Sequence, residues 1–174
     1  MKIQDKIRAC HTFRWSNANT ARHQTVAEHS WAVAIIADEF CDRMEVDGFT
    51  RRNVMLYAVY HDIAEGVLGD VLATTKKRLN GEINALEKEL IDGMEGAKPP
   101  TKASNEVLKI VKVADRIEAL AFISENGVGK HAEKITSNML SNFKKTYSTA
   151  EYSRRFRLQA HTLLNDIIQG EVML

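Results

Sequence analysis

The chain has 174 residues, a usual size for one domain with a substantial core. Apolar residues make up 44% and charged residues 27%, which is typical of a folded globular protein and far from disordered or membrane-spanning chains. The 24 basic and 23 acidic residues leave a formal net charge of +1. This charge argues against a polymeric nucleic acid as partner, because its phosphate backbone is bound through an excess of positive charge.

The start of the chain, MKIQDKIRAC, is charged throughout and does not resemble a signal peptide. No apolar run approaches the roughly 18 residues of a membrane-spanning helix. We therefore expect a cytoplasmic protein with no membrane partner. Cys10 and Cys41 fit neither a disulfide framework nor a zinc ribbon, so we interpret both as reduced and structural.

Apolar residues recur at helical spacing along the chain, which predicts an all-α, single-domain helical bundle over residues 1–174 with about six to eight helices. The first clear helix begins at Val26, and its inward face carries Val26, His29, Val33, Ile36 and Phe40. A second helix is expected from a Thr50 cap to about Glu65, with Val54, Ala58, His61 and Glu65 in line.

The next segment, TTKKRLN, is interpreted as a short exposed turn, and residues 82–94 as an amphipathic helix. Pro99 and Pro100 then interrupt the chain before a long helix. One face of that helix carries Leu108, Val111, Asp115, Glu118 and Phe122, so Asp115 is expected to point inward. Two further helices, near 130–146 and 151–169, complete the predicted bundle.

Four polar groups fall on these inward faces, namely His29, His61, Asp62 and Asp115. Burying a carboxylate costs several kcal/mol unless it is paired or bound to a cation. Imidazole and carboxylate ligands together suit a divalent metal such as Zn, Co, Mn, Fe or Mg. Each group alone has an ordinary explanation: a hydrogen-bonded core histidine, a polar helix end, or an ion pair of Asp115 with Lys112 or Arg116. The set of four favours a metal site.

These groups occur in VAEHSWAVAIIA, YHDIAEGVLGD and KVADRIEAL, in the order His, His-Asp, Asp. This order resembles the HD-domain phosphohydrolase superfamily, which implies an all-helical fold that binds one or more divalent metal ions. With FRW at 13–15 and GD at 69–70, the motifs are similar to those of bacterial 5'-deoxynucleotidases and of short phage relatives that hydrolyse dATP. The resemblance covers residues 7–125 by motif.

The resemblance implies roles for the following residues. The metal ligands would be His29, His61, Asp62 and Asp115. Glu65, one turn beyond His61, would hold the attacking water and take its proton, the alternative being an exposed acid at a helix end. Asp70 would lie near the sugar or a second ion, the alternative being a plain turn residue.

The implied substrate-binding residues are Arg14, Trp15, Arg22, Lys76 and Lys112. Arg14 and Trp15 would line the nucleotide pocket, because a guanidinium offers a fork for phosphate and an indole ring offers a stacking face. The two lysines would face the phosphates, and Arg22 would help to position them. The alternatives are a core position for the tryptophan and solvated surface positions for the lysines.

The relatives usually continue GD with a proline-containing stretch, whereas this chain reads GDVLATTKK, and this difference and the short length favour the phage type. We therefore expect metal-dependent hydrolysis of a deoxynucleotide at the α-phosphate, above all of dATP to deoxyadenosine and triphosphate. The alternatives are a 5'-deoxynucleotidase acting on monophosphates and a non-catalytic helical module that senses nucleotides or binds a partner. The resemblance also implies a homo-oligomer, and action in the host cytoplasm if a phage encodes the chain.

Overall fold

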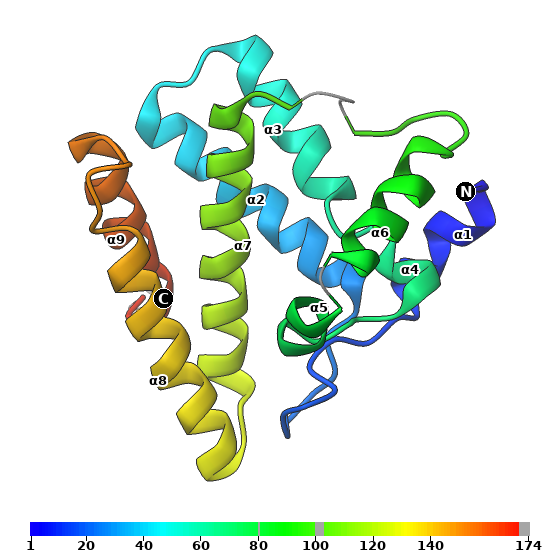
Figure 1. The fold of residues 1–174 in the computed structure, drawn as a ribbon. Coiled ribbons are helices and arrows are strands. Elements are labelled where there is room, and N and C mark those ends of the chain that lie inside the picture. Colours follow the sequence, from blue (N-terminus) through cyan, green and yellow to red (C-terminus); the bar gives the residue numbers. More distant parts are fainter. Residues whose placement is uncertain (80, 100–102, 171–174) are drawn as a thin grey trace.

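A computed structural model of the protein describes residues 1–79, 81–99 and 103–170 (Figure 1). Within these ranges the chain forms nine α-helices, one short 3-10 helix and no strand beyond two isolated β-bridges. The elements are α1 (Ile3–Ile7), η1 (Arg8–Cys10), α2 (Val26–Met44), α3 (Gly48–Tyr60), α4 (Glu65–Leu68), α5 (Ala73–Arg78), α6 (Glu82–Asp92), α7 (Asn105–Asn126), α8 (Gly129–Thr146) and α9 (Arg154–Ile168). The predicted all-α fold is confirmed.

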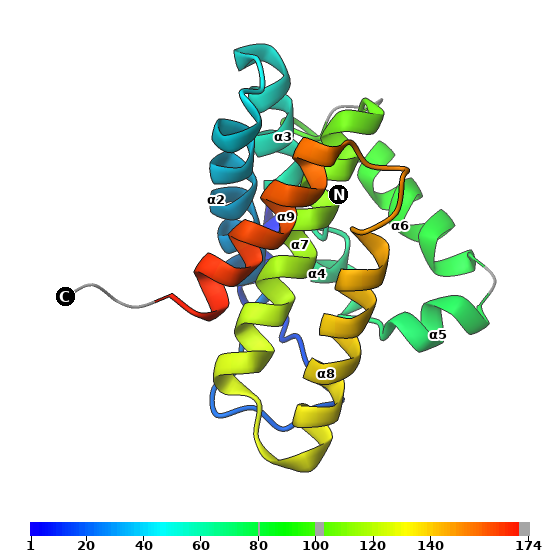
Figure 2. The same ribbon diagram turned by 90° about the vertical axis from the view of Figure 1, so that its left-hand side faces the viewer.

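Helices α2 and α7 pack against each other at the centre of the molecule (Figure 1). Helix α3 contacts both of them, α9 lies against both, and α8 runs beside α7, as the view in Figure 2 also shows. The short elements α1, η1 and α4 pack together near the start of α2. This arrangement leaves the N-terminal end of α2, the end of α3 and the middle of α7 close to one another.

The main apolar core joins the C-terminal half of α2 to α3, α7, α8 and α9. Its fully buried side chains include Phe40, Ile110, Ile117, Phe143 and Leu164. Burying one such side chain contributes about 1.5–3 kcal/mol to stability. The core therefore fixes how α2 and α7 cross, and with it the separation of any groups that these helices carry.

The predicted bounds of the second helix are wrong at both ends. Its cap is Asp47, whose carboxylate accepts hydrogen bonds from the backbone N–H groups of Phe49 (3.0 Å) and Thr50 (3.1 Å). Asp47 therefore caps a helix that begins at Gly48, three residues before the start that a Thr50 cap implies. The helix ends at Tyr60, because the next residues form tight turns with hydrogen bonds between residues three apart, and Glu65 begins the separate helix α4.

Two other expectations need correction. The segment interpreted as an exposed turn forms most of α5, and Lys76 on it is only partly exposed because it contacts two carboxylates. Leu108 is 39% exposed, since Val107, Ile110 and Val111 take the inward positions at that end of α7. Asn80 and Pro100, which belong to the predicted turn and the predicted helix break, lie outside the described residues.

The remaining helices agree with the prediction. The helix from Val26, the amphipathic helix after residue 82 and the two C-terminal helices lie where expected, with ends shifted by up to three residues. The described part of the chain has nine α-helices, more than the expected six to eight, because α1, α4 and α5 are short and were not predicted; the other six have more than ten residues. Both cysteines are free, Cys10 exposed and Cys41 buried, and burial raises the pKa of the Cys41 thiol to about 11.

Among the described residues, no helix combines the length and the apolar character that a membrane crossing requires.

Candidate metal centre

His29 is placed by the first turn of α2. The Thr25 hydroxyl accepts a hydrogen bond from the N–H of Glu28 (3.1 Å), and the Glu28 carboxylate accepts one from the N–H of Thr25 (2.6 Å). This reciprocal capping box fixes the first turn of the helix. The inward position one residue later belongs to His29, which is completely buried.

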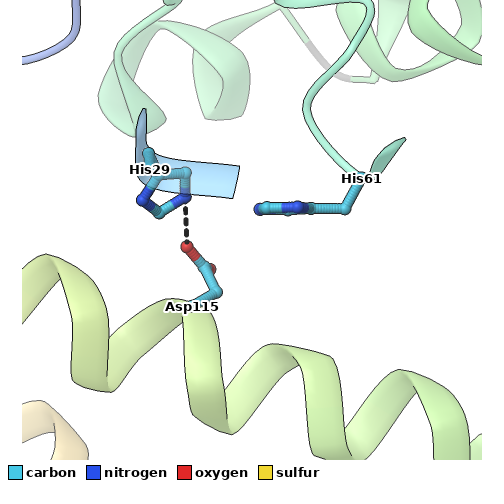
Figure 3. Close-up of side chains that lie close together, drawn as sticks. All are labelled: His29, His61 and Asp115. Carbon is cyan, nitrogen blue, oxygen red and sulfur yellow. Dashed lines mark ion pairs between the residues drawn. The ribbon is translucent and has the colours of Figure 1, made fainter. Parts of the chain in front are cut away.

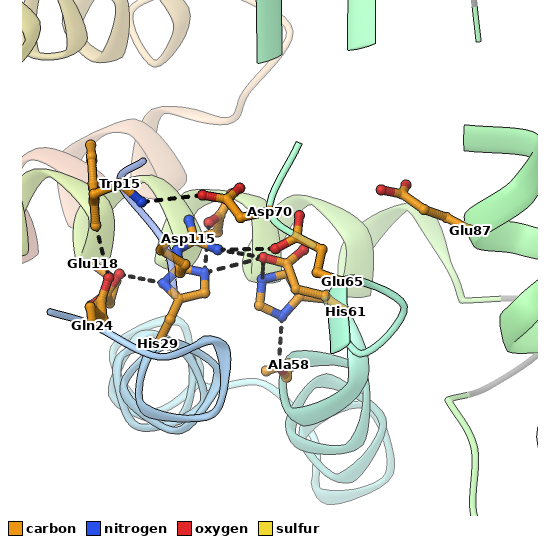
Figure 4. A network of polar contacts seen from close by, with 12 residues as sticks. Trp15, Gln24, His29, Ala58, His61, Glu65, Asp70, Glu87, Asp115 and Glu118 are labelled. Carbon is orange, nitrogen blue, oxygen red and sulfur yellow. Dashed lines mark hydrogen bonds and ion pairs between the residues drawn. The ribbon is translucent and has the colours of Figure 1, made fainter. Parts of the chain in front are cut away.

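A carboxylate fixes the orientation of the His29 ring. Its Nδ1–H donates to Glu118 of α7, because an ionised carboxylate can only accept. Glu118 is itself held by Gln24, whose side-chain amide donates to it over 2.5 Å (Figure 4). The other ring nitrogen, Nε2, therefore faces Asp115 at 3.2 Å and Asp62 at 3.5 Å. A hydrogen bond of this kind behind a histidine is the usual support for a metal ligand.

His61 follows directly on the end of α3 and is oriented in the same way. Its Nδ1 donates to the backbone carbonyl of Ala58 (2.7 Å), which leaves Nε2 pointing at Asp62 (3.3 Å). The Nε2 atoms of His29 and His61 are both buried, and neither has a hydrogen-bond partner. Figure 3 shows the two rings and Asp115 converging, and their possible ligand atoms all lie within 4.8 Å of one another.

The carboxylates of Asp62 and Asp115 place negative charge beside these rings, which favours the binding of a cation. Burial alone would lower the pKa of His29, but the nearby carboxylates of Asp115, Asp62 and Glu118 raise it well above its usual value. Burial alone would raise the pKa of the Asp62 carboxyl, but the nearby rings of His61 and His29 hold it well below its usual value. The Nε2 atoms of two imidazoles and the oxygens of two carboxylates thus face one small space. A divalent metal ion fits this donor set and would satisfy both unpaired Nε2 atoms.

Glu65 opens α4 beside this cluster and is only 4% exposed. Helix α4 can approach η1 so closely because position 66 is glycine: a Cβ there would lie 3.0 Å from the backbone nitrogen of Ala9. Burial and the nearby charge of Asp62 raise the pKa of the Glu65 carboxyl to about 7. Lys76 contacts Glu65 at 3.2 Å. A carboxylate with a pKa near neutrality is suited to accept a proton at physiological pH.

The loop before α2 brings Arg14 and Trp15 to the same place. Arg14 is 2.7 Å from Asp62, and its backbone N–H donates to the carbonyl of Gln24 (2.9 Å). Trp15 has a positive φ of 65°, which is uncommon for a residue with a side chain. Its backbone N–H donates to Asp70 (3.2 Å), and its indole N–H donates to Gln24 (3.0 Å). The hydrogen bonds to Asp70 and Gln24 thus hold the strained Trp15 at its backbone and at its side chain.

These groups surround a cavity of about 410 Å³ that opens beside the ligand cluster. Among the predicted site residues, its lining includes Arg14, Trp15, Asp62, Glu65, Asp70, Lys76 and Asp115. Neither His29 nor His61 lines this cavity, and His61 lines a smaller one with Tyr57 and Tyr60. The structure therefore brings together all four predicted ligands, both predicted catalytic carboxylates and three of the five predicted substrate-binding residues.

The other two predicted substrate-binding residues lie elsewhere. Arg22 is half exposed, packs over the ring of Phe122 (4.9 Å) and lines a different cavity, on the far side of Glu118. Lys112 is exposed on α7 and does not line the cavity beside the ligand cluster. The sequence interpretation assigned no role to Gln24 or Glu118. Glu118 shared the inward face of α7 with Asp115, which was a usable signal, whereas Gln24 offered none.

Fold and site together define a helical phosphohydrolase of the HD type. The family model described as 5'-deoxynucleotidase YfbR-like matches residues 8–153, so the chain belongs to the family of YfbR-like 5'-deoxynucleotidases.

Two phage proteins are similar over most of the chain. The dATP triphosphohydrolase of Cyanophage S-2L is 29% identical over 147 residues, which cover 81% of this chain and 80% of that protein. The dATP triphosphohydrolase of Salmonella phage PMBT28 is 32% identical over 139 residues, 76% of this chain and 71% of that protein. A 4'-phosphooxetanocin A phosphatase of Priestia megaterium is 26% identical over 121 residues, 61% of this chain and 62% of that protein.

The fold is also found in a solved structure, the HD phosphohydrolase DatZ of Cyanophage S-2L bound to dA and one catalytic Zn²⁺ ion. The two structures superpose with a TM-score of 0.81 over 98% of each chain, at 23% sequence identity. At this identity the likeness establishes the fold.

Proposed function

We propose that the protein hydrolyses a deoxynucleoside triphosphate, dATP above all, at the α-phosphate. In this reaction the oxygen of a water molecule bonds to the α-phosphorus and the bond to the 5' oxygen breaks, which releases deoxyadenosine and inorganic triphosphate. The observation that carries the proposal is the convergence of His29, His61, Asp62 and Asp115 beside a cavity lined by Arg14 and Trp15. The similarity to two phage dATP triphosphohydrolases supports the choice of substrate.

The four ligands would hold a divalent ion, Zn, Co, Mn or Mg, which when bound polarises a phosphoryl oxygen and lowers the pKa of water. Zinc is favoured by the mixed imidazole and carboxylate set and by the Zn²⁺ of the related DatZ structure. Arg14 donates to Asp62 across the edge of the cavity and contacts Glu65 at 3.9 Å. Its planar fork is suited to the α-phosphate, which it would bind while remaining close to the ligand carboxylate.

Glu65 is the proposed proton acceptor. It is buried, it lies beside the ligand cluster, and its pKa of about 7 leaves a substantial ionised fraction at neutral pH. Lys76 bridges Glu65 (3.2 Å) and Glu87 (2.7 Å), so it restrains the catalytic carboxylate and adds positive charge to the phosphate side of the cavity.

Trp15 and Asp70 are proposed to bind the nucleoside. The indole ring stacks on Phe122 with 5.9 Å between ring centroids, and it is held at its N–H by Gln24. A ring restrained on one side offers its other surfaces to the sugar and base. Asp70 fixes the Trp15 backbone and also lines the cavity, which places a hydrogen-bond acceptor at its wall. Lys112 and Arg22 would act on the anionic substrate only from a distance.

The second candidate is a 5'-deoxynucleotidase that converts monophosphates to deoxynucleoside and phosphate. The family name and the related phosphatase of Priestia megaterium favour it. The same ligands and the same Glu65 would serve, because attack at the phosphorus and departure of the 5' oxygen are common to both substrates. The two functions differ in how many phosphates the cavity admits.

The test is a product assay with purified protein, deoxynucleoside mono-, di- and triphosphates, and Zn, Co, Mn or Mg. Deoxyadenosine and inorganic triphosphate from dATP are the expected products, and Glu65→Gln should abolish turnover while the protein still binds metal. The matched control is Glu89→Gln, an exposed acid on α6. Orthophosphate from dAMP, with dATP left intact, would establish the monophosphatase instead. No turnover and no bound metal would indicate the non-catalytic module.

The single-domain organisation, the homo-oligomer and the host cytoplasm as place of action stay predictions. For the oligomer, large apolar side chains are exposed on α2 and α3, namely Trp31 (69%), Ile35 (51%) and Phe49 (77%). Exposed apolar groups of this size are what an interface between copies would bury. Sedimentation of the purified protein, with Trp31→Glu as the disruptive variant, tests this expectation.

A further inference from the structure

Three basic side chains line the cavity beside the ligand cluster: Arg14, Lys76 and Arg116. Two of them are already paired with carboxylates, Arg14 with Asp62 (2.7 Å) and Lys76 with Glu65 (3.2 Å) and Glu87 (2.7 Å). No ion pair formed within the described ranges of the chain includes Arg116. Among these three side chains, Arg116 is thus the one whose positive charge is least neutralised by carboxylates of the described chain.

The guanidinium of Arg116 is nevertheless held in place. Its central carbon lies 5.5 Å from the ring centroid of Tyr147, which is completely buried under α8 and α9. Contact with an aromatic face orients a guanidinium without removing its hydrogen-bonding capacity. The Tyr147 hydroxyl is buried and has no hydrogen-bond partner. Arg116 is therefore presented to the cavity as a restrained donor with its N–H groups unused by any carboxylate of the described chain.

The space around Arg116 extends away from the ligand cluster. Arg116 and Met139 line both the cavity beside the ligand cluster and a second one of about 210 Å³, which also contacts Leu120, Asn142 and Phe143. The two cavities therefore adjoin where α7 and α8 face each other. Arg116 directly follows the proposed ligand Asp115 in α7. If the α-phosphate binds at the ligand cluster, the β- and γ-phosphates can extend toward this second cavity.

We propose that Arg116 binds the β- and γ-phosphates of the substrate and is the residue that favours a triphosphate over a monophosphate. This inference rests on the proposed hydrolysis at the α-phosphate. Arg14 and Lys76 lie at the side of the cavity toward Glu65, where the reacting phosphate belongs, whereas Arg116 lies toward α8. A guanidinium can make two parallel hydrogen bonds to a phosphate group, which a monophosphate bound at the α position would leave unused.

The first test compares dATP with dAMP in the wild type, in Arg116→Met and in the matched control Lys134→Met, which removes an exposed positive charge from α8. For Arg116→Met, kcat/KM with dATP should fall about 10- to 100-fold, mostly through KM, as expected for losing charge-assisted hydrogen bonds. With dAMP it should fall less than about fivefold, the scale of a screened surface charge. Equal falls for both substrates, or none for dATP, would overturn the proposal.

The second test does not depend on turnover of dATP. Binding of inorganic triphosphate and of orthophosphate to the metal-loaded protein is measured by calorimetry in the wild type and in Arg116→Met. If Arg116→Met weakens the binding of triphosphate but not of orthophosphate, the role of Arg116 is supported. This holds even if dATP proves not to be a substrate, and then only the proposed function fails. Unchanged triphosphate binding refutes the role of Arg116, whatever the substrate.

Arg116→Met also removes a contact with Tyr147, so it has to be separated from a folding defect. Arg116→Lys keeps the charge and loses the fork, and it should recover part of the triphosphate affinity. Tyr147→Phe keeps the ring, removes the unpaired hydroxyl and should leave the preference for triphosphate in place. If thermal unfolding shows that Arg116→Met does not fold, these two variants decide: equal triphosphate binding by Arg116→Lys and the wild type would contradict the bidentate role.

Discussion

The two halves of helix α2 lie in opposite environments. Toward its C-terminal end, Ala37, Phe40 and Cys41 are buried in the apolar core against α3, α7 and α9. Toward its N-terminal end, His29 is equally buried but contacts the carboxylates of Asp115 and Glu118, with Asp62 nearby. One half of this helix thus belongs to the apolar core, and the other half carries a candidate metal ligand. The difference teaches where stability and function reside in this fold.

Unpaired polar atoms follow the same division. Among the described residues, buried side-chain atoms without a hydrogen-bond partner occur in Arg14, His29, His61, Glu65 and Tyr147. Four of these residues belong to the candidate metal centre, and the fifth lies behind Arg116. Leaving a buried polar atom unpaired costs about 1–3 kcal/mol, so such atoms persist where a ligand satisfies them. The apolar half stabilises a site that is costly for the fold on its own.

The largest expected effect on stability comes from the apolar half. Phe40→Ala should lower the free energy of unfolding by about 3–5 kcal/mol, because it empties a completely buried position between α2 and α9. Metal affinity of the folded protein should stay unchanged, since Phe40 contacts none of the ligands. Urea unfolding and metal titration measure the two quantities. Leu158→Ala, at a 61% exposed position on α9, is the control and should change stability by less than about 0.5 kcal/mol.

In the polar half of α2 we expect a smaller effect, which changes the metal affinity instead of the stability. Glu118→Gln should weaken metal binding about 10- to 100-fold, because it disturbs the carboxylate that fixes the His29 ring. Competition with a chelator during zinc titration measures the affinity. Glu125→Gln, an exposed acid on the same helix, is the control. If Glu118→Gln binds metal as tightly as the wild type, the hydrogen bond to Nδ1 has no positioning role.

The smallest effect concerns an ion pair outside both regions. Arg51 makes two hydrogen bonds to Asp38 (2.6 and 2.7 Å), and these bonds lower the pKa of the Asp38 carboxyl. A carboxyl whose pKa is lower in the folded state stabilises the fold above its unfolded pKa of about 3.9, and this contribution is lost as the pH falls through the folded value. Both side chains are more than a third exposed, so the contribution should be below about 1 kcal/mol.

Urea unfolding of the wild type and Asp38→Asn checks this sign. The variant should be less stable at pH 7, and the difference from the wild type should shrink as the pH is lowered through the acid range. A difference that persists unchanged at the low pH would show that the substitution acts through packing.

Periodicity predicted the long helices well, because α2, α7, α8 and α9 each keep one apolar face over four or more turns. Periodicity could not predict the short helices α4 and α5, since four and six residues are too few to show a helical period. The end of α3 was misplaced because tight turns from His61 onward keep the same inward direction that a continued helix would have.

The ligand set followed from the order of motifs, whereas its supports did not. Gln24 acts through a contact with a residue 94 positions away, and such a pairing leaves no local signal. Arg116 was considered only as an ion-pair partner for Asp115, its neighbour in the chain. In the structure it extends toward Tyr147 instead, and the packing of α8 against α7 decides this direction.

The most direct test of the account is anomalous diffraction at the metal absorption edge from crystals grown with zinc or manganese. The account predicts a peak between His29, His61, Asp62 and Asp115, with about 2.0–2.2 Å between the ion and the Nε2 and carboxylate ligand atoms. A protein that hydrolyses deoxynucleotides but shows no peak there, or binds its ion through other residues, would contradict it.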